Sequence, residues 1–250
     1  MTQERLFEAY TFGAEERSQL DRDGHFAFPG LLTAHARSRL TDSLEHISAL
    51  PNTGDFTPQR YSAEYDSYLA SLIAHPQLLD MARGVLGKSI RFDHCVALTR
   101  PSGDRGIGWH SHDYANDRTD LGFIRIFFYV NGFSPDDGGL KVVPGSHLFR
   151  DSSLRAASDE ELRSGWMAGK THPLTGARLE IIPLEAPPGT VILMWTHAAH
   201  AVTPRRLGSD TRWSVVYAYR NPGEPSRARW ITEGFQNDPP PGTEALMPLL

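Results

Sequence analysis

Two histidines and a carboxylate in one short stretch are the first candidates for chemistry in this sequence. His110 and His112 lie two residues apart, and Asp113 follows directly. In an extended segment, residues i and i+2 point to the same side, so the two imidazoles would project together. Because neutral imidazole is a common metal ligand, this spacing predicts a metal site.

A third histidine follows a later hydrophobic segment, 190–195, which reads as a buried strand. If a barrel brings this strand beside the first histidine pair, His197 or His200 would reach the same point. Three imidazoles with open positions suit iron or another first-row divalent metal, and zinc is compatible with the ligand type. Cys95 is the only cysteine, which excludes a zinc site built from several cysteines and a disulfide within the chain.

Two arginines, Arg212 and Arg125, lie on expected strands and are candidates for facing a cavity between them. Arg212 falls on the expected strand 211–220, on the face of Ser214, and its guanidinium can hold a carboxylate through two parallel hydrogen bonds. The alternative for Arg212 is a surface ion pair. Arg125 lies inside the apolar segment 122–131, where a charge must be paired or face a polar cavity. Further candidates for the pocket wall are Tyr129 and Trp195.

The composition favours a globular protein that acts on a small molecule. Of 250 residues, 40% are hydrophobic and 22% are charged, enough apolar material for a packed core. The net charge of -5, without a cluster of Lys and Arg, argues against a nucleic-acid partner. We find no signal peptide and no apolar run long enough to span a membrane, and the single cysteine favours a cytoplasmic location.

The elements expected to position these residues are two helical regions followed by short strands. Apolar spacing predicts helices within 15–50, interrupted by a strand at 25–28, and over 76–86. Alternating or buried patterns predict strands at 90–98, 122–131, 140–144, 178–184, 190–195 and 211–220. This order favours a mainly β fold with flanking helices, as one domain over 1–250.

Other segments carry less information. The stretch 51–68 reads as a loop, and the chain beyond residue 221 reads as irregular. A helix beginning after Ser158 lies in an insertion, 149–177, that is either a lid over the site or a surface excursion. The loop and the insertion would define the substrate, which the sequence does not identify.

The ordered motifs resemble those of a known enzyme family. They are a Trp-His-x-ligand motif at 109–112, the segment Asp-Gly-Gly-Leu-Lys-Val-Val-Pro-Gly-Ser-His at 137–147, a distal histidine and a later arginine. Over residues 20–219 the chain resembles the phytanoyl-CoA dioxygenase-like family of Fe(II)- and 2-oxoglutarate-dependent oxygenases. The resemblance implies a double-stranded β-helix, which is a jelly-roll, cupin-like fold. It also implies a dioxygen-dependent oxidation of a small-molecule substrate, with 2-oxoglutarate as the cosubstrate.

The resemblance also assigns roles to individual residues. It implies that His110 and His200 bind iron and that Arg212 holds the distal carboxylate of 2-oxoglutarate, assisted by Thr203 and Ser214. The family motif is His-x-Asp, however, and this sequence has His112 at the third position. Either His112 completes a three-histidine site, or a bulge lets Asp113 bind the metal instead.

Three hypotheses therefore follow from the sequence. The first is an oxygenase that hydroxylates or otherwise oxidises a small molecule with iron and 2-oxoglutarate. The second is a three-histidine metal dioxygenase that does not use 2-oxoglutarate, for which Arg212 would be dispensable. The third is a non-catalytic β-helix module that binds a small molecule, for which fold alone is no evidence of activity.

Overall fold

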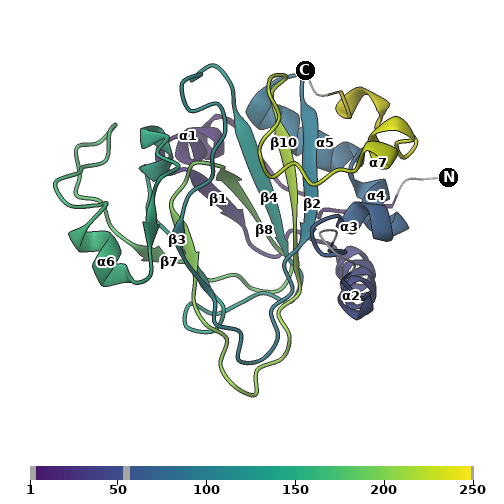
Figure 1. Ribbon diagram of the computed structural model, residues 1–250, viewed down its shortest axis with the longest axis horizontal. Helices are drawn as coiled ribbons and strands as arrows, with labels where there is room; N and C mark the ends of the chain where they lie inside the picture. The colour runs from purple at the N-terminus through teal and green to yellow at the C-terminus, as the bar shows by residue number, and fades with distance from the viewer. Residues whose placement is uncertain (1–3, 53–56, 249–250) are drawn as a thin grey trace.

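Two antiparallel five-stranded sheets face each other in the computed structural model, which describes residues 4–52 and 57–248 (Figure 1). The major sheet has the order β1 (His25–Phe28), β8 (Thr190–Trp195), β4 (Phe123–Tyr129), β10 (Ser214–Arg220), β2 (Arg91–Ala97). The minor sheet has the order β6 (Arg155–Ala156), β3 (Ile107–His110), β9 (His200–Val202), β5 (Leu140–Val142), β7 (Ile182–Pro183). This pair of sheets confirms the double-stranded β-helix that the resemblance implied.

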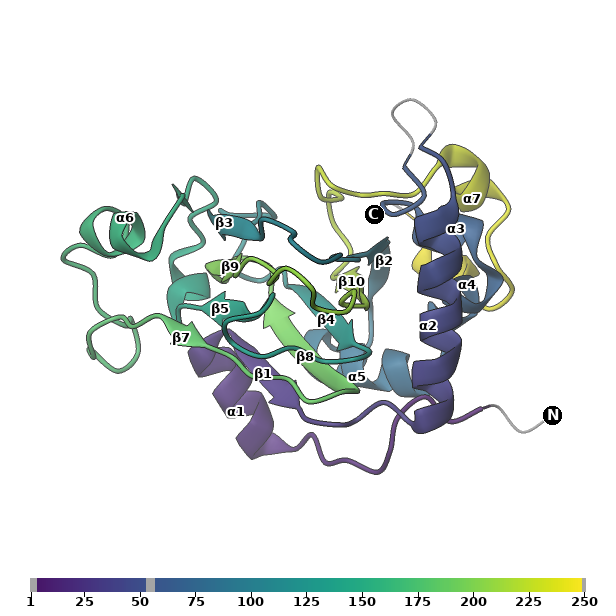
Figure 2. The same ribbon diagram turned by 90° about the horizontal axis from the view of Figure 1, so that it is seen from below.

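Helices cover the outer face of the major sheet, as Figure 2 shows for α1, α2 and α5. Their bounds are α1 Ala14–Asp23, α2 Ala34–Ala49, α3 Ser62–Tyr65, α4 Ser67–Leu72 and α5 Pro76–Leu86. Thr33 caps α2 by accepting a hydrogen bond from the Ala36 amide, and Pro76 occupies the first turn of α5. Both helix starts agree with the sequence patterns.

The major sheet separates two cores because its side chains alternate between its faces. On β4, Ile124, Ile126 and Phe128 pack against the helices. Phe127 and Tyr129 point into the space between the sheets. Arg125 also lies on this inner face, so of the two alternatives that the sequence left open its charge faces the cavity.

A β-bulge changes the expected face of one residue pair on β2. The register between β10 and β2 shifts at Asp93, so that Tyr219 pairs with Phe92 and Ala218 pairs with His94. Ile90, just before β2, and Phe92 therefore pack with the helices, whereas unbroken alternation along 90–98 would put both on the face of His94. His94 keeps its inward position beside Asp93.

Several elements differ from those expected. The stretch 51–68, read as a loop, contains α3 and the start of α4, while its residues 53–56 lie outside the described chain. The tail read as irregular contains α7 (Glu233–Asn237) and the short 3-10 helix η2 (Glu244–Leu246). Only 182–183 of the segment 178–184 is a strand. Short polar helices held mainly by tertiary contacts leave weak periodicity in sequence.

The insertion at 149–177 lies at the opposite end of the long axis from α2 and α7 (Figures 1 and 2). It follows the 3-10 helix η1 (Ser146–Phe149) and contains α6 (Asp159–Ser164), whose first turn is capped by Ser158. Among the described residues, no helix has the length and apolar character needed to cross a membrane.

Candidate metal centre

Three histidines converge between the two sheets. The nitrogens that His110, His112 and His200 can offer to a metal all lie within 4.8 Å of one another. His110 and His200 are paired neighbours on β3 and β9, and their ring centroids are 4.2 Å apart. His112 lies two residues beyond His110, and its ring centroid is 4.9 Å from that of His110.

Backbone hydrogen bonds fix which nitrogen two of these rings present. Nδ1 of His110 donates to the Gly108 carbonyl, and Nδ1 of His200 donates to the Ala198 carbonyl, both over 2.9 Å. A carbonyl oxygen can only accept, so in both neutral rings Nε2 keeps its lone pair. Burial lowers the pKa of each triad histidine, and the charge of Arg125 lowers it further. Neutral rings with free Nε2 atoms are what a metal site requires.

Asp113 does not join this group. Its side chain is 40% exposed, and its Oδ2 lies 3.7 Å from Nε of Arg227 on the surface. The backbone continues extended enough past β3 to bring His112, rather than Asp113, beside His110. Of the two alternatives left open by the sequence, the geometry favours the three-histidine set.

The triad opens into a cavity of about 240 Å³ between the sheets. Polar and charged side chains at its wall include His94, Arg100, Arg125 and Arg212. Apolar side chains such as Val96, Leu98, Phe127, Leu140, Val202 and Val216 line the rest. A few convergent polar groups within an apolar wall are typical of a small-molecule site.

Arg212 is the clearest anion-binding group in this cavity. Only 2% of its surface is exposed, and its buried Nε and Nη1 atoms find no hydrogen-bond partner in the part of the chain that the structure describes. The guanidinium lies over the rings of Tyr129 and Phe133, at 5.4 and 5.8 Å from their centroids. Burial lowers the Arg212 pKa to about 10, so the group stays charged near pH 7. A buried cation of this kind fits a carboxylate of 2-oxoglutarate.

Arg212 reaches the cavity from a position slightly different from that expected. It precedes β10 and forms an isolated bridge with Arg100. Arg100 itself is paired with Asp104, with 2.7 Å between Nη1 and Oδ1.

Two hydroxyls expected to assist Arg212 have other partners. Thr203 Oγ1 accepts a hydrogen bond from the Gly139 amide and donates to the Pro135 carbonyl. Ser214 Oγ donates to the Leu98 carbonyl over 2.9 Å. Neither residue belongs to the cavity wall. Both hydroxyls hold loops and strands together, which the sequence spacing alone did not reveal.

Of the two aromatic candidates, one lines the cavity and one does not. Tyr129 belongs to the wall, where it supports Arg212. Trp195 pairs with Ile124 across β8 and β4, so its side chain points to the opposite, helix-covered face. It borders a separate pocket of about 500 Å³ near Arg17 and His197. The expectation for Trp195 therefore does not hold in the structure.

The sequence missed the residues that close the cavity from the C-terminal side. Ala228 and Trp230 line it, although they lie in the tail that read as irregular. Trp230 is held by Arg60, 4.7 Å from its ring centroid, and by an edge contact with Tyr61. His94 on β2, which was not among the site candidates, is buried and also lines the cavity.

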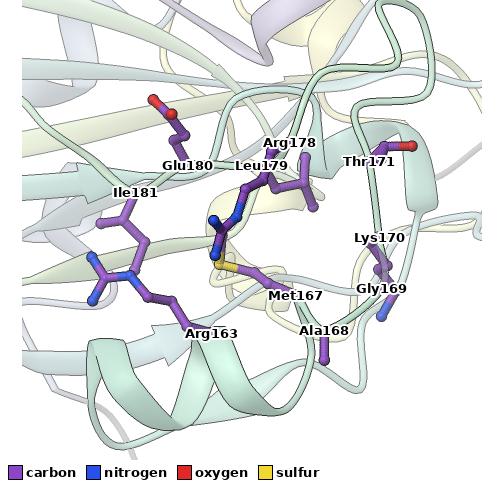
Figure 3. A pocket seen from close by; sticks show the side chains of 10 residues that line it. All are labelled: Arg163, Met167, Ala168, Gly169, Lys170, Thr171, Arg178, Leu179, Glu180 and Ile181. Atoms are coloured by element: carbon purple, nitrogen blue, oxygen red, sulfur yellow. The ribbon is translucent and has the colours of Figure 1, made fainter.

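No residue of the insertion 149–177 lines the metal cavity, which favours the surface excursion over the lid among the two alternatives. The insertion instead borders its own pocket of about 550 Å³, into which Arg163 and Arg178 extend (Figure 3).

Comparison with known proteins agrees with this geometry. The model of the family Phytanoyl-CoA dioxygenase (PhyH) matches residues 13–210. The chain belongs to this family.

Two curated proteins are similar in sequence to part of this chain. Dioxygenase lolE1 of Epichloe uncinata is 27% identical over 155 residues, which are 62% of this chain and 55% of that protein. A protein of Stutzerimonas stutzeri named "Probable alpha-ketoglutarate-dependent hypophosphite dioxygenase" is 23% identical over 157 residues, 61% of this chain and 53% of its own. The chain thus spans about half the length of these relatives.

A solved structure supports the fold. EctD from S. alaskensis, with 2-oxoglutarate and 5-hydroxyectoine bound, superposes with a TM-score of 0.65 at 20% identity. The superposition covers 86% of this chain and 80% of EctD.

Proposed function

We propose that this protein is an Fe(II)- and 2-oxoglutarate-dependent oxygenase that hydroxylates, or otherwise oxidises, a small molecule. The observation that carries the proposal is the buried guanidinium of Arg212, two of whose nitrogens have no hydrogen-bond partner among the described residues, in the same cavity as the histidine triad. A metal site alone has many uses, but a metal site facing a buried cation suits a chelating dicarboxylate. Membership of the PhyH family and the names of the relatives support the same activity.

In this proposal the side chains bind and orient the iron and the 2-oxoglutarate, and these two groups supply the oxidative chemistry. His110, His112 and His200 bind iron, and Arg212 binds the distal carboxylate of 2-oxoglutarate, while Tyr129 supports it. When bound, iron and 2-oxoglutarate would supply dioxygen activation, in which 2-oxoglutarate loses CO2 and takes up one oxygen atom to give succinate, while the second oxygen atom serves to oxidise the substrate. The apolar wall, including Phe127 and Val216, keeps water from the reacting atoms.

The first test is anaerobic binding of iron and then 2-oxoglutarate to the wild-type protein, Arg212→Gln and Arg206→Gln. We expect one iron per chain, and a metal-to-ligand absorption band when 2-oxoglutarate binds to the wild type. Arg212→Gln should weaken 2-oxoglutarate binding about tenfold or more, since it removes a charge-assisted fork. Arg206→Gln is the control because that arginine is exposed and pairs with Asp136.

Two outcomes would favour the other hypotheses. Iron binding without any response to 2-oxoglutarate would support a three-histidine dioxygenase, which the neutral ligand set also suits. Substoichiometric iron would support a non-catalytic binding module. A cytoplasmic location, expected from the single cysteine, stays a prediction that fractionation of the source cells would test.

A further inference from the structure

Arg125 is a second buried cation in the metal cavity, and the proposed function does not use it. It lies in the middle of β4 on the inner face and is 8% exposed. Its Nε donates a hydrogen bond to Thr196 Oγ1, over 3.3 Å. Within residues 4–52 and 57–248, no carboxylate lies at salt-bridge distance from Arg125.

Other buried arginines in the same fold have carboxylate partners. Arg100 pairs with Asp104, and the largely buried side chain of Arg205 pairs with Asp137. Asp93 accepts from His94 Nδ1, and its Oδ1 lies 3.3 Å from Nε of Arg220. Because leaving a buried charge without a counter-ion is costly, these pairs are the expected pattern. Arg125 and Arg212 depart from that pattern, and both line the cavity.

The two unpaired guanidiniums occupy different ends of the cavity. Arg212 lies over Tyr129, and Tyr129 is four residues from Arg125 on the same face of β4. Four strand residues correspond to about 13 Å. Arg125 also shares a contact residue with the triad, because Thr196 accepts a hydrogen bond from Arg125 Nε at its hydroxyl and one from the His112 amide, over 3.2 Å, at its carbonyl. A ligand at Arg125 would therefore lie beside the metal, away from the distal carboxylate site.

The charges in the cavity call for a further anion. The three triad histidines are neutral ligands, so they do not offset the charge of a divalent metal, as the aspartate of a His-x-Asp motif would. The metal and the two guanidiniums together exceed the two negative charges that 2-oxoglutarate brings. Thr196 accepts from Nε of Arg125, which leaves the terminal nitrogens to donate to two oxygens of an oxyanion.

We propose that Arg125 binds an anionic group of the primary substrate beside the metal, so that the substrate is a small carboxylate or comparable oxyanion. This inference rests on the proposed function, because it takes Arg212 as the cosubstrate anchor. The small size follows from the cavity, whose 240 Å³ must hold both cosubstrate and substrate.

The experiment is calorimetric titration of small anions into protein loaded with Ni(II) and saturating 2-oxoglutarate, at constant ionic strength. The probes are acetate and phosphite, with acetamide as the uncharged counterpart of acetate. The variants are Arg125→Gln and Arg125→Lys, and Arg212→Gln serves as the reference for lost 2-oxoglutarate binding. Far-UV circular dichroism and thermal melting check that each variant folds.

We expect the wild type to bind acetate or phosphite and not acetamide. Arg125→Gln should weaken anion binding about tenfold or more, and Arg125→Lys should retain part of it, because the charge remains while the fork is lost. The affinity of Arg125→Gln for 2-oxoglutarate should stay within about threefold of wild type. The comparison of acetate with acetamide in the wild type tests the charge requirement even if a variant fails to fold.

Three results would overturn the proposal. If Arg125→Gln loses 2-oxoglutarate as strongly as Arg212→Gln, then Arg125 belongs to the cosubstrate site. If anions bind Arg125→Gln as well as wild type, they are ligands of the metal itself. If neither anion binds the wild type, the cavity does not select anions. Failure of the proposed function would be visible earlier, as wild-type protein that does not bind 2-oxoglutarate at all.

Discussion

At the scale of single residues, the central feature is a histidine where the family motif has an aspartate. His112 lies within reach of the same point as His110 and His200, and Asp113 lies at the surface near Arg227. The ligand set is therefore neutral, and it carries one negative charge less than the ligand set of a His-x-Asp motif. The same difference makes the two positions easy to separate by mutation.

We predict that His112→Ala weakens iron binding at least about tenfold, because it removes one of three ligands. Asp113→Ala should change iron affinity less than twofold, since its carboxylate is outside the triad and 40% exposed. Anaerobic titration with Fe(II), followed by dialysis and metal analysis, measures both. Loss of iron from Asp113→Ala with retention in His112→Ala would instead support the bulged arrangement.

At the scale of elements, the approach of β3 to β9 sets the position of the triad. Gly106 precedes β3 with φ +72°, and a Cβ placed there would lie 2.2 Å from the Val202 carbonyl oxygen. Only glycine allows this contact together with this backbone conformation. The histidines of the two strands depend on that close approach.

We predict that Gly106→Ala costs more than twice the unfolding free energy lost in Gly30→Ala. Gly30 is the matched control, because it also has a positive φ, of +64°, but a Cβ there would meet nothing within 4 Å. The control should lose about 1 kcal/mol from backbone strain alone. Urea unfolding of both variants gives the comparison, and equal losses would show that the contact with Val202 is readily relieved.

At the scale of the whole molecule, two buried histidines outside the triad couple folding to pH. Burial lowers the pKa of His147 and of His197 to about 4. The unfolded chain has the ordinary histidine pKa of about 6.5, so it binds more protons than the folded chain between these values. Their contribution to stability is complete above pH 6.5 and is lost as the pH falls toward 4.

We predict that the unfolding free energy decreases over this window, by about 3 kcal/mol for each of the two groups. His147→Gln and His197→Gln should each reduce the dependence on pH, because glutamine does not titrate. Denaturant unfolding at pH 7, 6, 5 and 4 measures the slope. A slope unchanged in both variants would place the titrating groups elsewhere.

Local sequence patterns predicted most of the fold, because alternation and helix caps act over a few residues. The capped start of α2, the strand β8 and the inward face of β4 all follow from such patterns. The bulge at Asp93 was not predictable, since it depends on pairing with β10, far along the chain.

The candidate site was predicted where one short motif carries it, and missed where distant segments meet. His110 and His112 share a motif, and His200 and Arg212 were found by their order in the family pattern. The contribution of Trp230 depends on packing against Arg60. The roles of Thr203 and Ser214 depend on which backbone group each hydroxyl meets, which spacing does not specify.

Because the thiol of Cys95 is inaccessible, a cysteine introduced elsewhere in the chain can be labelled selectively. Cys95 is 2% exposed, and burial raises its pKa to about 12, so it stays protonated and shielded from thiol reagents at neutral pH. It is also the only cysteine in the sequence. A cysteine introduced at Glu224, in the segment leading to Trp230, would therefore carry a spin or fluorescent label selectively. The environment of the C-terminal segment beside the cavity, with and without bound ligands, becomes measurable by spectroscopy in a protein whose native cysteine is left in place.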